Sequence, residues 1–95
     1  MGATETAGTP VVGTIRYWAA AKAAAGAAEE PYRAVTLAGA LDAARERHAA
    51  QAEFARVLAD CSFLVDGEPV GMRDHAQVRL AAGGTVEVLP PFAGG

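Results

Sequence analysis

The sequence predicts an α+β domain in which one mixed sheet carries helices packed on a single face. Two observations lead to this prediction. Segments with the period-two alternation of half-buried strands stand at residues 11–18 and 85–88, and apolar residues at helical spacing occupy residues 37–59. An order of strand, helix, strand, helix and then strands favours one sheet covered on one side. Ninety-five residues fit one such domain.

The opening strand follows a leader of small polar residues, 1–10, which we expect to be flexible. Residues 11–18 alternate, with Val11, Ile15 and Tyr17 on one face and polar residues on the other. This alternation predicts a strand with one face against the core.

A short helix is expected directly after this strand. Residues 19–25 are six alanines and Lys22, all good helix formers, and Gly26 follows where a C-terminal glycine is typical. Residues 31–35 have the character of a short, irregular strand. Pro31 restricts that strand to an edge of the sheet, because proline cannot donate a hydrogen bond to a ladder.

Two helical segments occupy the middle of the chain. Thr36 is suited to cap the first, because its hydroxyl can accept from backbone N–H groups of the first turn. Residues 52–59 are a second helix or a continuation of the first. The apolar residues of the two segments recur at helical spacing and are Leu37, Ala40, Leu41 and Ala44, then Phe54, Val57 and Leu58.

Strands and turns are expected from residue 60 onward. Residues 60–62 end the helix, and residues 63–65 form a strand closed by Asp66-Gly67, a dipeptide suited to the positive φ angles of a tight turn. Further on, the last strand at 85–88 ends before two prolines that cannot donate to a ladder.

Another strand is predicted just before the last one. Val78 and Leu80 alternate with polar neighbours, which is the pattern of a half-buried strand. Gly83 and Gly84 then supply the turn that leads into the last strand.

Composition and charge exclude several classes of function. A net charge near −3 and a pI near 5.2 give no basic field, so nucleic acid is not an expected partner. Cys61 is the single cysteine, and with two distant histidines it supplies neither a disulfide nor a metal site. A reducing cytoplasm is the natural compartment, and no stretch is long and apolar enough to span a membrane.

The tail at residues 90–95 is the sharpest functional feature, and we expect it to extend beyond a folded domain at residues 11–89. Gly94 and Gly95 end the chain after a rigid Pro-Pro step. Six residues span roughly 20 Å at about 3.3 Å each, so the terminal carboxylate can enter a partner's cleft. Glycine has no Cβ, so the last two residues can pass through a narrow channel.

The terminal carboxylate is a poor electrophile, and an acyl-adenylate made with ATP is the usual way to activate one. The sequence has no Gly-rich phosphate loop followed by Lys and Ser or Thr. We therefore expect the chain to be the substrate of an activating enzyme. The alternative is that Gly94-Gly95 is merely a frayed end.

Two stretches resemble the MoaD/ThiS family of sulfur carrier proteins. They are residues 16–26, RYWAAAKAAAG, and residues 86–95, VEVLPPFAGG. The similarity covers residues 11–95, and the terminal Pro-Pro-x-x-Gly-Gly is specific because it ends the chain after a strand. The Pro-Pro form is more similar to MoaD, the small subunit of molybdopterin synthase, than to ThiS of thiamine synthesis.

The resemblance implies a β-grasp (ubiquitin-like) fold and a carrier cycle. In that cycle an E1-like, MoeB-like adenylyltransferase adenylates Gly95, and a sulfur donor protein converts it to a thiocarboxylate. A MoaE-like large subunit then takes the tail and passes the sulfur to a pterin precursor. The chain would be a protein co-substrate with no catalytic residue and no bound cofactor, and the activating partner would consume the ATP.

The expected site residues follow from this cycle and from the alternative that Trp18 and Phe92 form an exposed apolar patch for a partner. Gly95 bears the adenylate and then the thiocarboxylate, with Gly94 and Ala93 beside it in the tail. Members of the family commonly carry an acidic pair in the turn before the last strand, where this chain has Gly83-Gly84-Thr85. The expected docking residues are Phe92, Pro91, Pro90, Trp18 and Lys22.

Three other functions remain open. Carriers that supply sulfur for thiamine, cysteine or another metabolite have the same kind of tail. A ubiquitin-like modifier would use the same activated Gly95 to form an amide with a lysine of another protein. A non-covalent interaction module would bind through the sheet or through Trp18 and Phe92.

Several residues with reactive side chains are expected to have structural roles. Cys61 is interpreted as a small buried apolar residue and not as a sulfur relay. His48 and His75 are interpreted as solvated surface residues. Asp66 is explained by its turn and forms no general acid/base pair with Glu68. Trp18 is expected to cover the core, with an exposed patch as the alternative.

Overall fold

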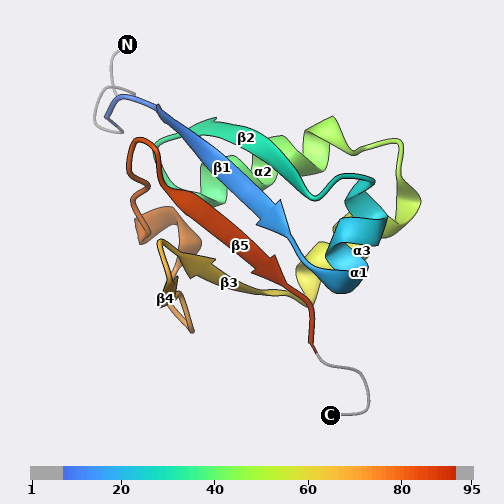
Figure 1. Ribbon diagram of the computed structural model, residues 1–95. Coiled ribbons are helices and arrows are strands. Elements are labelled where there is room, and N and C mark those ends of the chain that lie inside the picture. The colour runs from blue at the N-terminus through green and yellow to red at the C-terminus, as the bar shows by residue number, and fades with distance from the viewer. Residues whose placement is uncertain (1–7, 92–95) are drawn as a thin grey trace.

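The computed structural model describes residues 8–91 (Figure 1). Most of the predicted leader, residues 1–7, and the end of the predicted tail, residues 92–95, lie outside the described residues. The part described holds one five-stranded sheet and three α-helices. The predicted α+β class, a mixed sheet with helices, is therefore confirmed.

The sheet is mixed because its first and last strands are parallel neighbours at its centre. Its strands lie in the order β2-β1-β5-β3-β4, and only the pair of β1 and β5 is parallel. The strand bounds are β1 Val11–Tyr17, β2 Glu29–Ala34, β3 Ser62–Val65, β4 Glu68–Pro69 and β5 Thr85–Leu89.

The helices cover one face of this sheet. They are α1 Ala19–Ala25, α2 Leu37–Arg47 and α3 Ala52–Ala59. In Figure 1, α2 lies behind the sheet, and α1 and α3 lie together beside the end of β1. Thr36 caps α2 as predicted, since its Oγ1 accepts from the N–H of Gly39 at 3.2 Å. Gly26 ends α1 at φ 74°, also as predicted.

The core lies between the covered face of the sheet and the three helices. Alternate residues of the two central strands are fully buried, which is the period of two that the sequence showed. The residues at the centre of this core are Ile15, Tyr17, Val86 and Val88 from the sheet and Leu37, Leu41 and Phe54 from the helices.

The strand predicted at Val78 and Leu80 is wrong. The alternation is present, because both side chains are buried and Arg79 between them is exposed. However, the segment makes only one isolated bridge, between Arg79 and Thr36. It follows the 3₁₀ turn η2, His75–Gln77, and runs past the start of α2 rather than along a strand. Alternating burial alone does not give an extended segment a neighbouring strand.

His48 is not the solvated surface residue that the sequence indicated. The residue is 8% exposed, and its ring stacks on Phe54 at 4.4 Å between centroids. His48 Nε2 lies 2.9 Å from Glu30 Oε1, and its Nδ1 lies 2.6 Å from Gln51 Oε1. Tyr17 Oη also donates to Glu30, at 2.5 Å. A polar network therefore joins β1 and β2 to the loop between α2 and α3.

This network determines how Glu30 titrates. Burial on its own would raise the pKa of the carboxyl group, but the hydrogen bonds from Tyr17 and His48, with the attraction of His48 and Arg47, lower it below its usual range. A lowered pKa means that the folded state binds this proton less tightly than the unfolded state. The stabilisation is therefore present above the ordinary pKa of about 4.5 and is lost as the pH falls through the folded-state pKa.

Replacing Glu30 by glutamine should flatten the loss of stability on acidification. Urea unfolding between neutral pH and about pH 3 measures this, and the native chain should lose more free energy of unfolding over that range than E30Q does. E46Q, on an exposed part of α2, controls for the loss of one negative charge. Equal pH dependence in the native chain and E30Q would contradict the prediction.

Gly13 in β1 lies so close to Tyr32 and Gly84 that no side chain fits at this position. A Cβ built there would overlap the ring of Tyr32 and come within 2.5 Å of the Gly84 carbonyl oxygen. Tyr32 is held in this place because its Oη donates to the Ala81 carbonyl at 2.7 Å. Overpacking at Gly13 would therefore push against backbone as well as against a buried ring.

Gly13→Ala should lower the free energy of unfolding by about 3 kcal/mol. The matched control is Gly39→Ala in α2, where the new Cβ would meet Ala34 Cβ at an ordinary 3.5 Å. That control should gain about 0.5 to 1 kcal/mol, because alanine favours a helix over glycine. Denaturant unfolding of both variants checks the pair, and an equal loss in both would contradict the account of Gly13.

Candidate functional site

The root of the tail is fixed to the end of β1 by two hydrogen bonds from one residue. The backbone N–H of Trp18 donates to the Val88 carbonyl at 3.1 Å. Its indole Nε1–H donates to Glu87 Oε1 at 3.0 Å. Leu89 is the last residue of β5, and Pro90 and Pro91 follow it directly. The last residues before the tail therefore have a defined position relative to β1.

Trp18 lies on the surface and does not cover the core. The residue is 43% exposed, and the guanidinium of Arg16 lies 5.8 Å from the centre of the Trp18 ring. Arg16 in turn pairs with Glu29 of β2 at 2.8 Å. The alternative interpretation of Trp18, an exposed patch at the end of a strand, is the one that the structure supports.

Glu87 and Arg16 are surface residues of this patch that the sequence analysis did not identify. They are register partners in the parallel pair, and each is held by a contact with Trp18. The sequence did contain a pattern from which Glu87 and Arg16 could have been predicted. Period-two alternation in both central strands places the charged residues opposite the core, and the parallel pairing brings them together beside Trp18.

Lys22 lies one helical turn beyond Trp18. Its backbone N–H donates to the Trp18 carbonyl at 3.3 Å, and its side chain is exposed. Of the other predicted docking residues, Pro90 is half-buried and Pro91 is exposed. Trp18, Lys22 and the two prolines thus lie at one end of the sheet, and their role in docking stays a prediction.

The remaining predicted site residues lie outside the described residues: Phe92, Ala93, Gly94 and Gly95. Asp66 lies in the turn between β3 and β4, and it also contacts the first residue of β5. Its Oδ1 accepts from the Thr85 N–H at 2.8 Å, and its N–H donates to the Thr85 carbonyl at 2.8 Å. Asp66 thus joins the β3–β4 turn to the start of β5.

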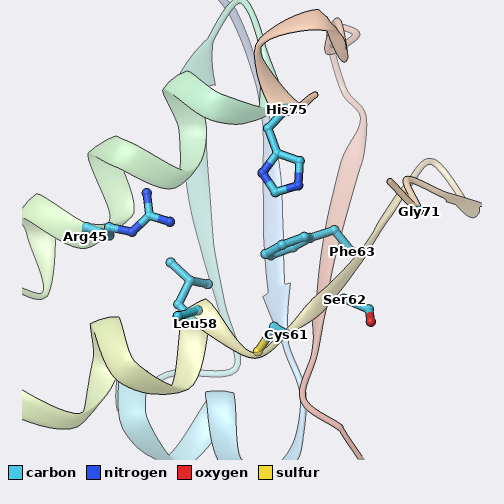
Figure 2. Close-up of a pocket in the computed structure, with 8 residues that line it drawn as sticks. Arg45, Leu58, Cys61, Ser62, Phe63, Gly71 and His75 are labelled. Carbon is cyan, nitrogen blue, oxygen red and sulfur yellow. The ribbon is translucent and has the colours of Figure 1, made fainter. Parts of the chain in front are cut away.

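A cavity of about 190 Å³ lies where the end of α3 meets the start of β3 (Figure 2). Arg45 from α2, His75 from η2 and Cys61 contribute its polar groups, and Leu58 and Phe63 contribute apolar walls. His75 packs edge-on against Phe63 at 5.2 Å between ring centroids and is half-buried, so it is only in part the solvated surface residue that was predicted.

Cys61 is half-buried at the edge of this cavity. Its Sγ lies 3.2 Å from the Val57 carbonyl, to which the thiol donates. Burial, with a smaller contribution from the Asp60 carboxylate, raises the pKa of the thiol. The thiol is therefore mainly protonated at neutral pH, which is unfavourable for a sulfur relay because the thiolate is the reactive form.

Neither a metal centre nor a membrane span is found in residues 8–91. No group of three or more His, Cys, Asp and Glu side chains there is arranged to hold a metal ion. No helix in that part of the chain is long and apolar enough to cross a membrane.

Comparison with known proteins identifies the family. Residues 15–95 match the model of the ThiS family. The chain belongs to the ThiS family. No protein with a curated description matches it. Membership places it among small carrier proteins of the ThiS type, which are in general not catalysts themselves.

Solved structures similar to this ThiS-family chain show its fold. Small archaeal modifier protein 1 from Methanosarcina acetivorans has a TM-score of 0.76 at 17% identity, covering 93% of this chain and all of that one. The protein of the same name from Haloferax volcanii gives 0.72 at 23% identity, covering 88% and 99%. The complex of subunits 1 and 2 of molybdopterin-converting factor from Helicobacter pylori gives 0.63 at 19% identity, covering 90% and 100%. The fold is a ubiquitin-like β-grasp, as the resemblance implied.

Alkylation of Cys61 should be slower than that of a free thiol. Iodoacetamide labelling of the folded chain at about pH 8, followed by intact mass, should lag labelling of glutathione at least several-fold, because burial raises the thiol pKa. The same chain unfolded in urea should react like the free thiol. Faster labelling of the folded chain than of the unfolded chain would contradict this.

Proposed function

We propose that this chain is a sulfur carrier whose Gly95 is adenylated and then converted to a thiocarboxylate. The pathway proposed is molybdopterin synthesis, with the chain as the small subunit of molybdopterin synthase. The single observation that carries the proposal is a ThiS-family domain whose last strand leads straight into Pro-Pro-x-x-Gly-Gly. The family implies a carrier or modifier, and the diglycine end is the group that both would use.

The chemistry has two steps, and the partners supply the catalysis for both. First, an E1-like, MoeB-like enzyme joins the Gly95 carboxylate to AMP from ATP and releases pyrophosphate. Second, a donor protein supplies sulfur at the oxidation level of sulfide, which attacks the carbonyl carbon. The bond to AMP breaks, AMP leaves with the electron pair, and a thiocarboxylate remains. The chain's own contribution is to present the tail, which requires a fixed root and no side chain at the last two positions.

The partner that would receive the tail is a MoaE-like large subunit. This part of the proposal is supported by the likeness to a chain of the Helicobacter pylori complex of subunits 1 and 2 and by the exposed end of the sheet around Trp18. Trp18 is an aromatic residue at the tail root, of the kind that anchors interfaces. Lys22, Pro90, Pro91 and Phe92 would complete the docking surface.

A ubiquitin-like modifier is the second candidate, because the two small archaeal modifier proteins share this fold. In that case the activated Gly95 would become an amide of a lysine on another protein. Delivery of the thiocarboxylate to thiamine, cysteine or another sulfurated metabolite is the third. All three share the activation of Gly95 and differ in the acceptor.

Reconstitution with ATP, a sulfur donor and an extract of the source cells tests the proposal. Intact mass after trapping with a thiol-specific reagent should show a sulfur adduct that depends on ATP. The trap is needed because exchange of oxygen for sulfur nearly coincides in mass with oxidation of Met72 or Cys61. A chain lacking Gly94-Gly95 should show no adduct.

The possible results separate the candidates. A trapped adduct on the native chain alone supports the carrier, and branched conjugates to other proteins support the modifier. No adduct and no conjugate would contradict activation of Gly95, provided that a known carrier is converted in the same extract.

Trp18→Ala should weaken binding of the MoaE-like subunit by at least about tenfold, because it removes an aromatic anchor at the tail root. Calorimetry or interferometry measures the dissociation constant. Arg33→Ala is the control, since Arg33 lies on β2 opposite Val12, near the far end of β1. Equal weakening by both variants would contradict a docking surface centred on Trp18.

A further inference from the structure

Lys22 is the only lysine among the 95 residues, and the other seven basic side chains of the Lys and Arg count are arginines. The difference matters in a chain that carries an activated acyl group. A lysine amine becomes a good nucleophile once it loses a proton, whereas a guanidinium stays protonated in proteins. Apart from the N-terminal amine, Lys22 is thus the one amine of these residues that could attack an activated tail.

This lysine is placed close to the root of the tail. Trp18 binds the Val88 carbonyl at 3.1 Å, and the Lys22 N–H binds the Trp18 carbonyl at 3.3 Å. The Lys22 backbone is therefore one helical turn, about 5.4 Å of rise, from the point where β1 meets the end of β5. Figure 1 shows α1 beside the end of β5. The Lys22 side chain is exposed and so is accessible to a nearby acyl group.

The length of the tail permits contact with this amine. From Pro90 to Gly95 the chain spans at most roughly 20 Å at about 3.3 Å per residue, which exceeds one helical turn several times over. The leader departs from the other end of the domain, because β1 and β5 run parallel and residue 11 lies at the start of β1. Among residues 8–91, Lys22 is the residue with a side-chain amine, and its backbone lies close to the tail root.

We propose that the Lys22 amine accepts the activated Gly95 acyl group of its own chain and closes an internal isopeptide bond. The proposal rests on the proposed function, because activation of Gly95 creates the acyl donor. The neutral amine attacks the Gly95 carbonyl carbon, a C–N bond forms, and the bond to the leaving group breaks. AMP leaves with the electron pair, and the proton lost by nitrogen passes to solvent.

The consequence is that an activated tail not taken up by a partner inactivates itself. The product has neither a free carboxylate to activate nor a thiocarboxylate to deliver. Uptake of the tail by a partner would remove Gly95 from Lys22. Closure would therefore occur only when delivery of the tail fails.

The test uses the full chain with a C-terminal thioester in place of the adenylate, prepared by intein cleavage with a small thiol. No activating enzyme is then required, so failure here is distinguishable from failure of the proposed function. After incubation of the folded chain at mildly alkaline pH, intact mass should show a monomer one water lighter than the free acid. Trypsin should then leave residues 17–33 joined to residues 80–95, because acylation blocks cleavage at Lys22 and Arg33 and Arg79 remain cleavable.

Two variants make the test specific. Lys22→Arg keeps the positive charge and should give only hydrolysed or thiol-exchanged monomer. Lys22→Arg combined with Arg33→Lys moves the one lysine to β2 opposite Val12, near the far end of β1. There the tail would need almost its full extension, so closure should fall at least about tenfold relative to the native chain. Unfolding both lysine-containing chains in urea should reduce that difference.

Three results would overturn the proposal. One is a native chain with no more closure than Lys22→Arg, and a second is equal closure when the lysine stands at position 33. The third is a native chain whose acylated product is mainly a dimer at low protein concentration, because this would make a second copy the acceptor. Circular dichroism of each variant confirms that the fold is retained.

Discussion

The parallel hydrogen bonding of β1 to β5 is the constraint on which the rest of the structure depends. It joins the first strand of the domain to the last, in register from Thr14↔Thr85 to Tyr17↔Val88. Both strands therefore end at the same edge, where Trp18 begins the turn into α1 and β5 leads into the tail. The helices bury the covered face of this pair, so core packing and the position of the tail root are fixed together. A non-local pairing of this kind becomes stable only when the intervening elements have packed against it.

The sequence predicted the parts of this fold that depend on local pattern. Alternation in residues 11–18 and 85–88 and the helical spacing of Leu37, Ala40, Leu41 and Ala44 all reflect direct contact with one core. The errors arise where burial depends on tertiary neighbours. Val78 and Leu80 have the alternation of a strand but no strand beside them. His48 is polar and isolated in sequence, yet Glu30 and Gln51 satisfy both its ring nitrogens in the interior.

The site was predictable in its chemistry more than in its geometry. The diglycine end and the Pro-Pro step are legible in the sequence because they act through covalent structure and backbone freedom. The group of Arg16, Trp18 and Glu87 is not, because it exists only when parallel pairing places Glu87 beside β1. The single lysine is visible from composition alone, whereas its proximity to the tail root depends on the hydrogen bond between Trp18 and Val88.

The most direct test of whether Gly95 carries sulfur is tandem mass spectrometry of the tail peptide. The chain is first purified from the cells that produce it naturally. Trypsin cuts after Arg79 and releases residues 80–95 as one peptide, because no Lys or Arg follows. If the chain is a carrier, part of this peptide should have one oxygen of Gly95 replaced by sulfur, and blocking the activating enzyme should remove that form. A peptide that always ends in an ordinary carboxylate, from cells that convert another carrier, would contradict the assignment.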